Sequence, residues 1–445
     1  MSNPSPWTTP SAPVPPHPAP PYGQPPQPHA RHQPFPGYAP SPAHQPPPHR
    51  GRPVVLVLVV GLVCLLVGAL LGVGGTLAVQ AWGGDPDAGR PAAEVVPERM
   101  PGIVAWIEER SGHAFTSEPD VTVLDDAAFE AALLEVDEDA EGSEPATLPT
   151  DDWTSTVTAL GLVQDPEAFD EFGESGFADG VVGFYSYADE SVVVRGTEWS
   201  PVVEVTLLHE LVHALQDQVV DLEAATAATR LYDESYTALS AVIEGQATLY
   251  ETDWLDEQSL AYSDEYWSTP GVGGPSEPFA EASASLPYSL GYWGTLVLEE
   301  AEGSEAVFDA LREPPTTLEQ LWDMPGWAAG TPSAADPAPL PDTSAPDGAE
   351  VLDRGSFGVH GLSLLTLDPQ DYAFLPDEES LPLEGWAGDA YVTWADGDGA
   401  CTRVVVRTDG ADDAAAWRDG LAGWTQDGGT VSTQDEQVVL ERCTT

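Results

Sequence analysis

One helical stretch, residues 200–218, constrains this chain more than any other part of its sequence. Ser200 followed by Pro201 is a helix-start signal, because the hydroxyl can cap the first turn and proline has its φ pre-set for it. Most of the following residues are apolar, and the polar ones recur three or four apart, at Thr206, His209, Glu210, His213 and Asp217. That spacing puts them on one face of a helix. An ordinary surface helix has a broad polar face. Here a narrow titratable stripe on an apolar helix predicts burial, so its charges need a partner.

The stripe contains the pattern His-Glu-x-x-His, formed by His209, Glu210 and His213. Two imidazoles at positions i and i+4 project from one face and can bind a single Zn²⁺, at Zn–N distances of about 2.0–2.1 Å. Glu210 points to the same side, where it can accept a proton from water on the metal. The alternative is a coincidental histidine pair, solvated or satisfied in the core; the apolar surroundings favour a metal site.

The identity of the third ligand decides the class of site, because catalytic zinc takes three protein ligands and leaves one position for water. Val219 stands where an extended pattern would place a third histidine. Glu244 lies in an apolar helical stretch, where a lone carboxylate would need a partner. We therefore predict Glu244 as the third ligand. The alternatives, in more polar surroundings, are Glu223, Glu234 and Glu251.

The N-terminal part predicts a membrane anchor. Residues 1–53 are rich in proline and contain no acidic residue, which is typical of a disordered, polyproline-II-like tail. Residues 54–79 form a run of 26 without a charged side chain, longer than the roughly 20 that cross a bilayer. This run begins too far from the start for an ordinary signal peptide. Arginines before it and aspartates after it predict a cytoplasmic tail and an extracytoplasmic remainder.

The remainder is strongly acidic. All 74 Asp and Glu lie after residue 80, with 11 of the 14 arginines and no lysine. This charge argues against nucleic acid and anionic lipid surfaces as partners. The negative charge would favour cationic peptides or divalent cations as partners. The alternative is that it reflects a composition bias of the whole proteome. Outside the apolar run the only cysteines are Cys401 and Cys443, which are expected to form a disulfide in an oxidising compartment.

Hydrophobic periodicity and turn residues predict the elements. Helices are expected at 97–110, 125–135, 152–162, 166–172, 224–250, 290–300, 304–311 and 412–421, and strands at 120–124, 181–187, 191–195, 391–394, 401–407 and 437–442. The strands at 181–187 and 191–195 form a hairpin before the central helix, where an exposed edge could pair with an extended peptide. Residues 137–152 are expected to be an acidic loop, and 252–285 a polar irregular loop that could gate a substrate.

These expectations combine into an α+β chain. We predict a disordered tail at 1–53, a transmembrane helix at 54–79, a linker at 80–95, a mostly helical domain with a small sheet and the predicted zinc site at 96–325, a Pro/Ala/Asp-rich loop at 326–350 and a C-terminal α+β subdomain at 351–445. The sequence leaves the oligomeric state open.

The motif HELVHALQDQ at 209–218, followed by Glu-Gly-Gln-Ala at 244–247, resembles gluzincin-type zinc metallopeptidases. More closely, it resembles a largely uncharacterised bacterial family with the pattern HELxHALQDQ…EGDA. The likeness continues through GFYSYADESVVVRG, LPYSLGYWGTLVLEE at 286–300, PPTTLEQLW at 314–322 and GWAGDAYVTW at 385–394. The resemblance implies a peptide substrate, His209, His213 and Glu244 as zinc ligands and Glu210 as base. Gln246 departs from the family's aspartate, which puts in doubt a contact that would strengthen metal binding.

Two roles stay open from the sequence. The oxyanion of the reaction needs a donor, for which Tyr288 is the candidate, with Tyr292 and His360 behind it; a packed aromatic is the alternative. Asp217 either orients a ligand imidazole or caps the helix end. The predicted function is a membrane-anchored, extracytoplasmic zinc peptidase, with Co²⁺ or Mn²⁺ as other metals for the same ligands. A non-hydrolytic zinc-containing scaffold or binding module at the cell surface is the alternative.

Overall fold

The computed structural model describes residues 85, 87–141, 153–171, 181–187, 189–229, 234–269, 278–330, 343–367, 385–397 and 399–444. All of them belong to one compact unit, residues 51–445. Within these ranges no helix combines the length and the apolar character needed to span a bilayer. The predicted tail at 1–53 and membrane segment at 54–79 lie outside the described residues.

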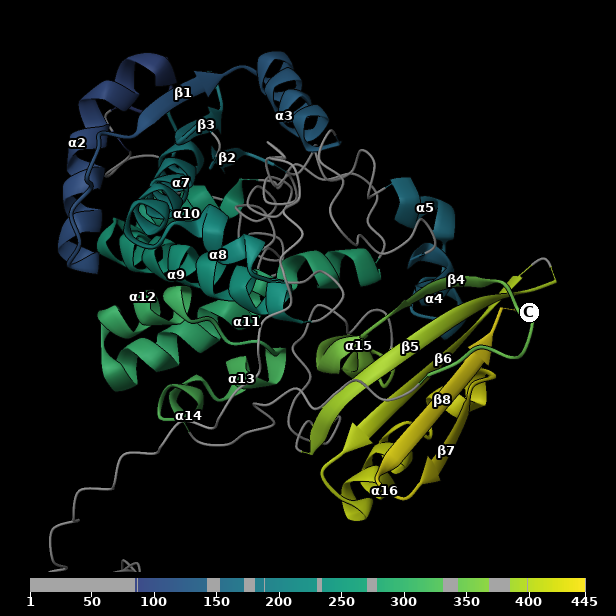
Figure 1. Ribbon diagram of the computed structural model, residues 1–445. Coiled ribbons are helices and arrows are strands. Elements are labelled where there is room, and N and C mark those ends of the chain that lie inside the picture. Colours follow the sequence, from purple (N-terminus) through teal and green to yellow (C-terminus); the bar gives the residue numbers. More distant parts are fainter. Residues whose placement is uncertain are drawn as a thin grey trace, which may run out of the picture. The chain divides into compact units, whose positions relative to one another are not determined.

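The fold is α+β, as predicted, with two sheets (Figure 1). The first sheet has the order β1-β3-β2, in which β1 (Asp120–Leu124) is parallel and β2 (Gly183–Ser186) antiparallel to β3 (Ser191–Arg195). The second is antiparallel with the order β4-β5-β6-β8-β7. Its strands are β4 (Val351–Gly355), β5 (Trp386–Asp396), β6 (Gly399–Thr408), β7 (Thr430–Gln434) and β8 (Gln437–Cys443).

Helices make up most of the residues that the structure describes before residue 330. They are α2 (Ala92–Ser111), α3 (Asp126–Glu141), α4 (Trp153–Leu160), α5 (Pro166–Glu171), α7 (Pro201–Val220), α8 (Leu222–Ala227), α9 (Ser235–Glu257), α10 (Leu260–Ser268), α11 (Pro278–Glu302), α12 (Ser304–Arg312), α13 (Leu318–Trp322) and α14 (Met324–Ala328). The C-terminal part adds α15 (Gly358–Leu364), α16 (Ala411–Gly420) and a 3₁₀ turn at Trp424–Asp427.

The central helix α7 begins as its sequence predicts. Pro201 is its first residue, and the Ser200 hydroxyl accepts a hydrogen bond from the backbone N–H of Val203 at 3.4 Å. From Pro201 to Gln216 every residue except Val202 is buried. The helix packs against β2 and β3 and against α9. The polar stripe therefore lies inside the protein, as its apolar surroundings indicate.

Several boundaries differ from the predictions. The helix expected at 97–110 begins at Ala92, and the region 224–250 is divided between α8 and α9. The gating loop expected at 252–285 is wrong in its described part, which holds the end of α9, all of α10 and the start of α11. Ser259 starts α10 by accepting a hydrogen bond from Tyr262 N–H at 3.3 Å, a capping signal that the polar composition concealed. In the acidic loop expected at 137–152, α3 continues to Glu141.

The helices α9 and α11 cross in contact at two glycines. A Cβ atom on Gly245 would clash with the backbone carbonyl of Gly291, and one on Gly291 would clash with that of Ala241. Only residues without a side chain let the two backbones come this close. Because Gly245 follows Glu244, this crossing fixes the helix that carries the predicted third ligand.

We expect Gly245→Ala to lower the free energy of unfolding by about 1–3 kcal/mol, because the added methyl overpacks a backbone contact. Urea unfolding followed by circular dichroism measures the change. Gly102→Ala on α2 is the matched control: its Cβ would meet no atom within 4 Å, so helix propensity should make it neutral or stabilising by up to about 1 kcal/mol. Equal effects of the two variants would contradict the close crossing.

The predicted disulfide links two neighbouring strands of the C-terminal sheet. Cys401 on β6 pairs directly with Cys443 on β8, and the two sulfurs are bonded. The helices α4 and α16 both pack against this sheet. Trp424 Nε1 and an Arg442 guanidinium nitrogen donate to the carbonyl oxygen of Leu160, at 2.9 and 2.8 Å. These two bonds join the C-terminal part to α4.

Candidate metal centre

The three predicted metal ligands lie together in the core. His209 and His213 are one turn apart on α7, and Glu244 lies on the facing helix α9. One ligand atom from each lies within 4.8 Å of the others. Glu244 Oε2 is 3.2 Å from His209 Nε2 and 3.5 Å from His213 Nε2. The group could hold a metal ion, and each side chain is at most 1% exposed.

The spacing and the unpaired atoms fit a tetrahedral ion. Ligands about 2.0–2.1 Å from Zn²⁺ lie about 3.3–3.4 Å apart at tetrahedral angles, close to the two distances observed. His213 Nε2 and Glu244 Oε1 are buried without a hydrogen-bond partner among the described residues. Each such atom costs about 1–3 kcal/mol when left unpaired. A cation between the three groups would remove that cost for the ligand atoms it contacts.

Hydrogen bonds orient both imidazoles. His209 Nδ1 lies 3.0 Å from Glu251 Oε1, and His213 Nδ1 lies 2.9 Å from Gln216 Oε1. With a metal ion bound, each Nδ1–H would donate to its oxygen, which would leave the Nε2 lone pair for the ion. Such partners fix the tautomer and the ring direction of metal-binding histidines. The sequence did not assign these roles, although Glu251 is among the alternatives for the third ligand.

Gln246 helps to orient Gln216, the hydrogen-bond partner of His213. The Gln216 amide nitrogen donates to the carbonyl of Ile243 at 2.9 Å and to Gln246 Oε1 at 3.0 Å. Because its nitrogen faces two acceptors, the amide oxygen of Gln216 must face the imidazole. Gln246 thus provides the acceptor oxygen that an aspartate would provide at this position, without the negative charge.

We expect Gln216→Ala to weaken zinc binding about 10–100-fold, because His213 loses the acceptor that fixes its Nδ1–H. Competition with a zinc chelator measures the affinity. Gln218→Ala is the control on the same helix, since the Gln218 side chain bonds Thr116 and Ser117 outside the metal group. If both variants bound zinc like the wild type, the role of Gln216 would be disproved.

Glu210 is buried beside the ligands. Its side chain is 0% exposed, and neither carboxylate oxygen has a hydrogen-bond partner among the described residues. A Cβ on Gly183 of β2 would touch the Glu210 side chain, so this strand lies directly against it. Burial raises the pKa of Glu210, the charge on His209 opposes the rise, and Glu244 and Glu251 add to it. A carboxylate with a raised pKa is suited to proton transfer near neutral pH.

Two further carboxyl groups, Glu210 and Glu251, lie beside the three predicted ligands. Burial lowers the pKa of His209, but Glu251 and Glu244 outweigh this effect and raise it well above its usual value. Burial also raises the pKa of Glu244, but His213 and His209 outweigh it, and the net pKa is lowered. Three carboxylates thus face two imidazoles. A divalent cation would offset that excess.

The three candidates for the oxyanion donor, Tyr288, Tyr292 and His360, lie in different surroundings. Tyr288 is buried on α11, and its ring is stacked at 27° to the His209 ring with the centroids 6.4 Å apart. Tyr292 makes an edge contact with Trp293. His360 is buried on α15, where neither ring nitrogen has a hydrogen-bond partner among the described residues. Of the three, Tyr288 is the one seen packed against a ligand.

Tyr187, directly after β2, is a site residue that the sequence analysis missed. Its hydroxyl is buried without a hydrogen-bond partner among the described residues, and its ring packs edge-on against Tyr185 at 5.1 Å. Burial, followed by Glu244, Asp217 and Glu210, raises the pKa of Tyr187 well above its usual value. The hydroxyl therefore stays protonated, and the charges of Glu244 and Glu210 act on it. The alternation of a strand puts it on the face of Gly183 and Tyr185, a signal the sequence contained.

The remaining candidates do not bind the metal group. Asp217 accepts from the Tyr185 hydroxyl at 3.0 Å and from the N–H of Leu222, the first residue of α8, at 2.9 Å, and neither bond goes to an imidazole. Glu234 accepts from the backbone N–H groups of Leu318 and Val359. Glu223 is exposed on α8.

Searches of protein-family models, curated proteins and solved structures found no match to this chain. The resemblance to gluzincin-type peptidases therefore stays a prediction from the motifs.

Proposed function

We propose that this chain is a gluzincin-type zinc peptidase with His209, His213 and Glu244 as ligands. The observation that carries the proposal is the juxtaposition of this group with Glu210, a buried carboxylate whose oxygens have no partner among the described residues. Two histidines and one glutamate are a ligand set of catalytic zinc. A metal group that only stabilised the fold would have no need of an unpaired acid beside it.

In this mechanism the chain supplies a base, two side chains that orient the metal-binding imidazoles, and a hydrogen-bond donor. Bound zinc would lower the pKa of its water toward about 7 and polarise the scissile carbonyl. Glu210 accepts the water proton and passes it to the leaving amine. Glu251 and Gln216 hold the imidazoles in place through their Nδ1–H groups. Two tyrosines are proposed as donors to the developing oxyanion: Tyr288, which packs beside His209, and Tyr187, whose buried hydroxyl has no hydrogen-bond partner among the described residues.

The edge strand β2 is the proposed site for the peptide backbone. It is the edge strand of its sheet nearest the catalytic group, with Gly183 against Glu210. An extended peptide can add to such an edge through main-chain hydrogen bonds. All four residues of β2 and all the site side chains are buried, so this proposal requires the site to open for the substrate.

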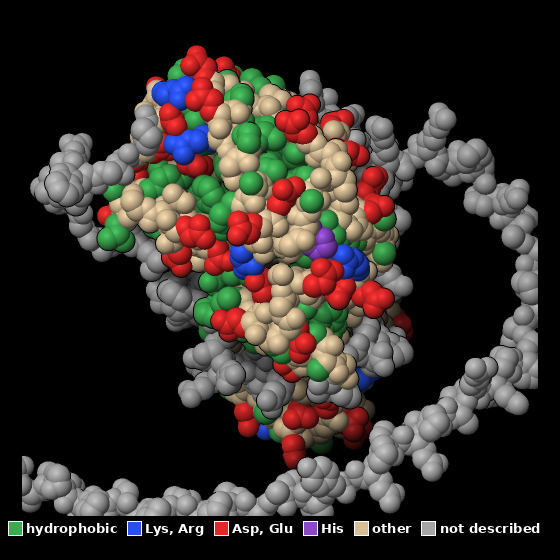
Figure 2. Space-filling view, turned by 90° about the vertical axis from the view of Figure 1, so that its left-hand side faces the viewer, with side chains coloured by type: hydrophobic (Ala, Val, Ile, Leu, Met, Phe, Trp, Pro, Cys, Tyr) green, Lys and Arg blue, Asp and Glu red, His purple; other side chains and the backbone are tan. Residues whose placement is uncertain are grey.

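The proposed location is extracytoplasmic, behind a single transmembrane anchor at 54–79. The Cys401–Cys443 disulfide supports an oxidising compartment. The excess of acidic residues would repel the phosphates of nucleic acids, so no nucleic-acid partner is proposed. On the face drawn in Figure 2, acidic side chains are spread over the surface.

The complete burial of the metal group favours one second candidate, a zinc-containing scaffold without hydrolytic activity. Structural zinc sites are closed to solvent, as this one is, but they use four protein ligands. Metal analysis of the purified chain combined with digestion of a peptide library separates the two. Cleavage that is lost with a chelator and restored by zinc supports the peptidase; bound zinc without cleavage of any peptide supports the scaffold.

A further inference from the structure

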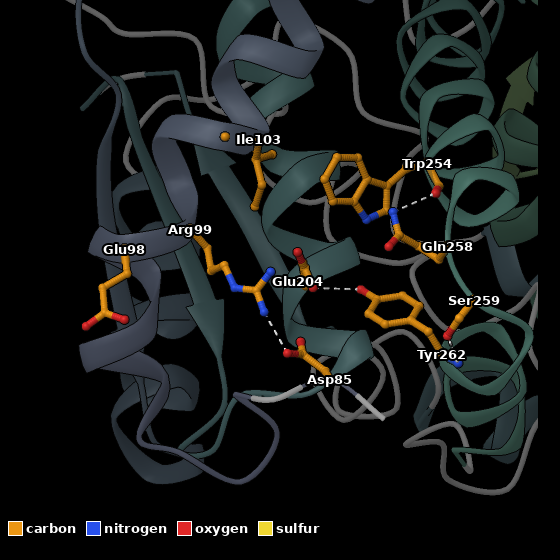
Figure 3. A pocket seen from close by; sticks show the side chains of 10 residues that line it. Asp85, Glu98, Arg99, Ile103, Glu204, Trp254, Gln258, Ser259 and Tyr262 are labelled. Atoms are coloured by element: carbon orange, nitrogen blue, oxygen red, sulfur yellow. Dashed lines mark hydrogen bonds and ion pairs between the residues drawn. The ribbon is translucent and has the colours of Figure 1, made fainter. Parts of the chain in front are cut away.

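A cavity of about 410 Å³ lies beside the N-terminal half of α7 (Figure 3). Its lining includes Arg99 from α2, Glu204 from α7, Trp254 from α9 and Tyr262 from α10, with Gln258 at the end of α9. None of these residues belongs to the metal group. The cavity is therefore a second candidate site.

Glu204 gives the cavity its chemical character. Its side chain is buried, at 4% exposure, and lines the cavity. One carboxylate oxygen accepts the Tyr262 hydroxyl at 3.0 Å, and the other receives no hydrogen bond from a described residue. A buried carboxylate with an unpaired oxygen needs a cationic partner or a proton.

The basic residue in the cavity wall, Arg99, forms its ion pairs with carboxylates other than Glu204. Arg99 forms ion pairs with Asp85 at 2.6 Å and Asp87 at 2.7 Å, and its guanidinium turns toward Asp85 (Figure 3). Glu98 is 60% exposed and pairs with Arg90. The acidic groups thus exceed the basic ones around the cavity, and Glu204 is the carboxylate left without an ion pair among the described residues.

The other walls suit an organic cation. Trp254 and Tyr262 offer aromatic rings, which attract ammonium and guanidinium groups. The Gln258 amide nitrogen donates to the Trp254 carbonyl at 3.1 Å, which leaves the amide oxygen as a second acceptor at the cavity. A hard metal ion would need six or more oxygens around a smaller space.

We propose that this cavity binds an organic ammonium or guanidinium group, which donates to Glu204 and Gln258 and packs its carbon atoms against Trp254. The strongly acidic chain raises the local concentration of such cations. The group can belong to a lysine or arginine side chain of a peptide or to a free amine. The proposal does not depend on the peptidase activity.

Calorimetric titration of the full-length chain in mild detergent tests the proposal. The cationic probes are Nα-acetyl-lysine amide and cadaverine, and the neutral probe is Nα-acetyl-norleucine amide. We expect at least one cationic probe to bind about tenfold or more tightly than the neutral one, because a buried carboxylate is a strong acceptor for a charged donor. Preference for the lysine amide supports a peptide side chain, and preference for cadaverine supports a free amine.

Two variants locate the effect. Glu204→Gln keeps the shape and an acceptor for Tyr262 but removes the charge, and should abolish the preference for the cationic probe. Glu98→Gln, at the exposed rim, should change it by about twofold or less. If thermal melting shows that Glu204→Gln is unfolded, Gln258→Leu takes its place in the experiment. This variant should weaken the binding of the cationic probe about threefold or more. Equal binding of all probes, no binding of any probe, or equal losses in the Glu204 and Glu98 variants would overturn the proposal.

Discussion

Glu210→Gln should bind zinc like the wild type and hydrolyse peptides at least about 10²–10⁴-fold more slowly. The amide has the size of the carboxylate but cannot accept the water proton, and general-base catalysis contributes about that factor. The site should keep its shape, because no described residue hydrogen-bonds the Glu210 carboxylate oxygens. The change should therefore appear in kcat, with zinc content and thermal stability maintained.

The control is Glu223→Gln, which makes the same replacement at an exposed residue of α8. Its turnover should equal that of the wild type. Cleavage of a fluorogenic peptide library and elemental analysis of the same preparations provide both readouts. Undiminished turnover in Glu210→Gln would remove the assigned base, even if the zinc ligands were correct.

Glu244→Ala should purify with little or no zinc, whereas the wild type should hold about one ion per chain. Two imidazoles one turn apart would remain, and a two-ligand site competes poorly with water and buffer. Saturating zinc at 100 times its dissociation constant stabilises a folded chain by about 2.7 kcal/mol. The wild type should therefore melt several degrees higher with zinc than after chelation, and Glu244→Ala should lose most of that difference.

Asp256→Ala is the matched control, because it removes an exposed carboxylate from the same helix. It should keep both the zinc and the thermal shift. Full zinc occupancy in Glu244→Ala would contradict the third ligand, and Glu251, which faces the other nitrogen of His209, would be the next carboxylate to substitute.

Local patterns were sufficient for the central helix and for the three residues that come together beside it. The Ser200–Pro201 start, the apolar surroundings and the three- and four-residue spacing of the stripe depend on neighbours along one helix, and each was confirmed. Glu244 could be selected because its own helix is apolar around it, and the Cys401–Cys443 bond because two cysteines were available near predicted strands. Short polar elements such as β7 carry too little hydrophobic signal to be predicted from the sequence.

The sequence by itself determined the buried stripe on α7 and the α+β class, since these follow from residue type and helical or strand period. Tertiary structure alone decided that Glu251 of α9 hydrogen-bonds His209. Gln216 lies three residues from His213 on α7, but its amide is oriented by contacts with Ile243 and Gln246 of α9. Tertiary structure also decided that Asp217 accepts the Tyr185 hydroxyl and that two glycines bring α9 and α11 into contact. The physical reason is that these roles depend on distances between elements far apart in the chain, which packing sets and local periodicity does not.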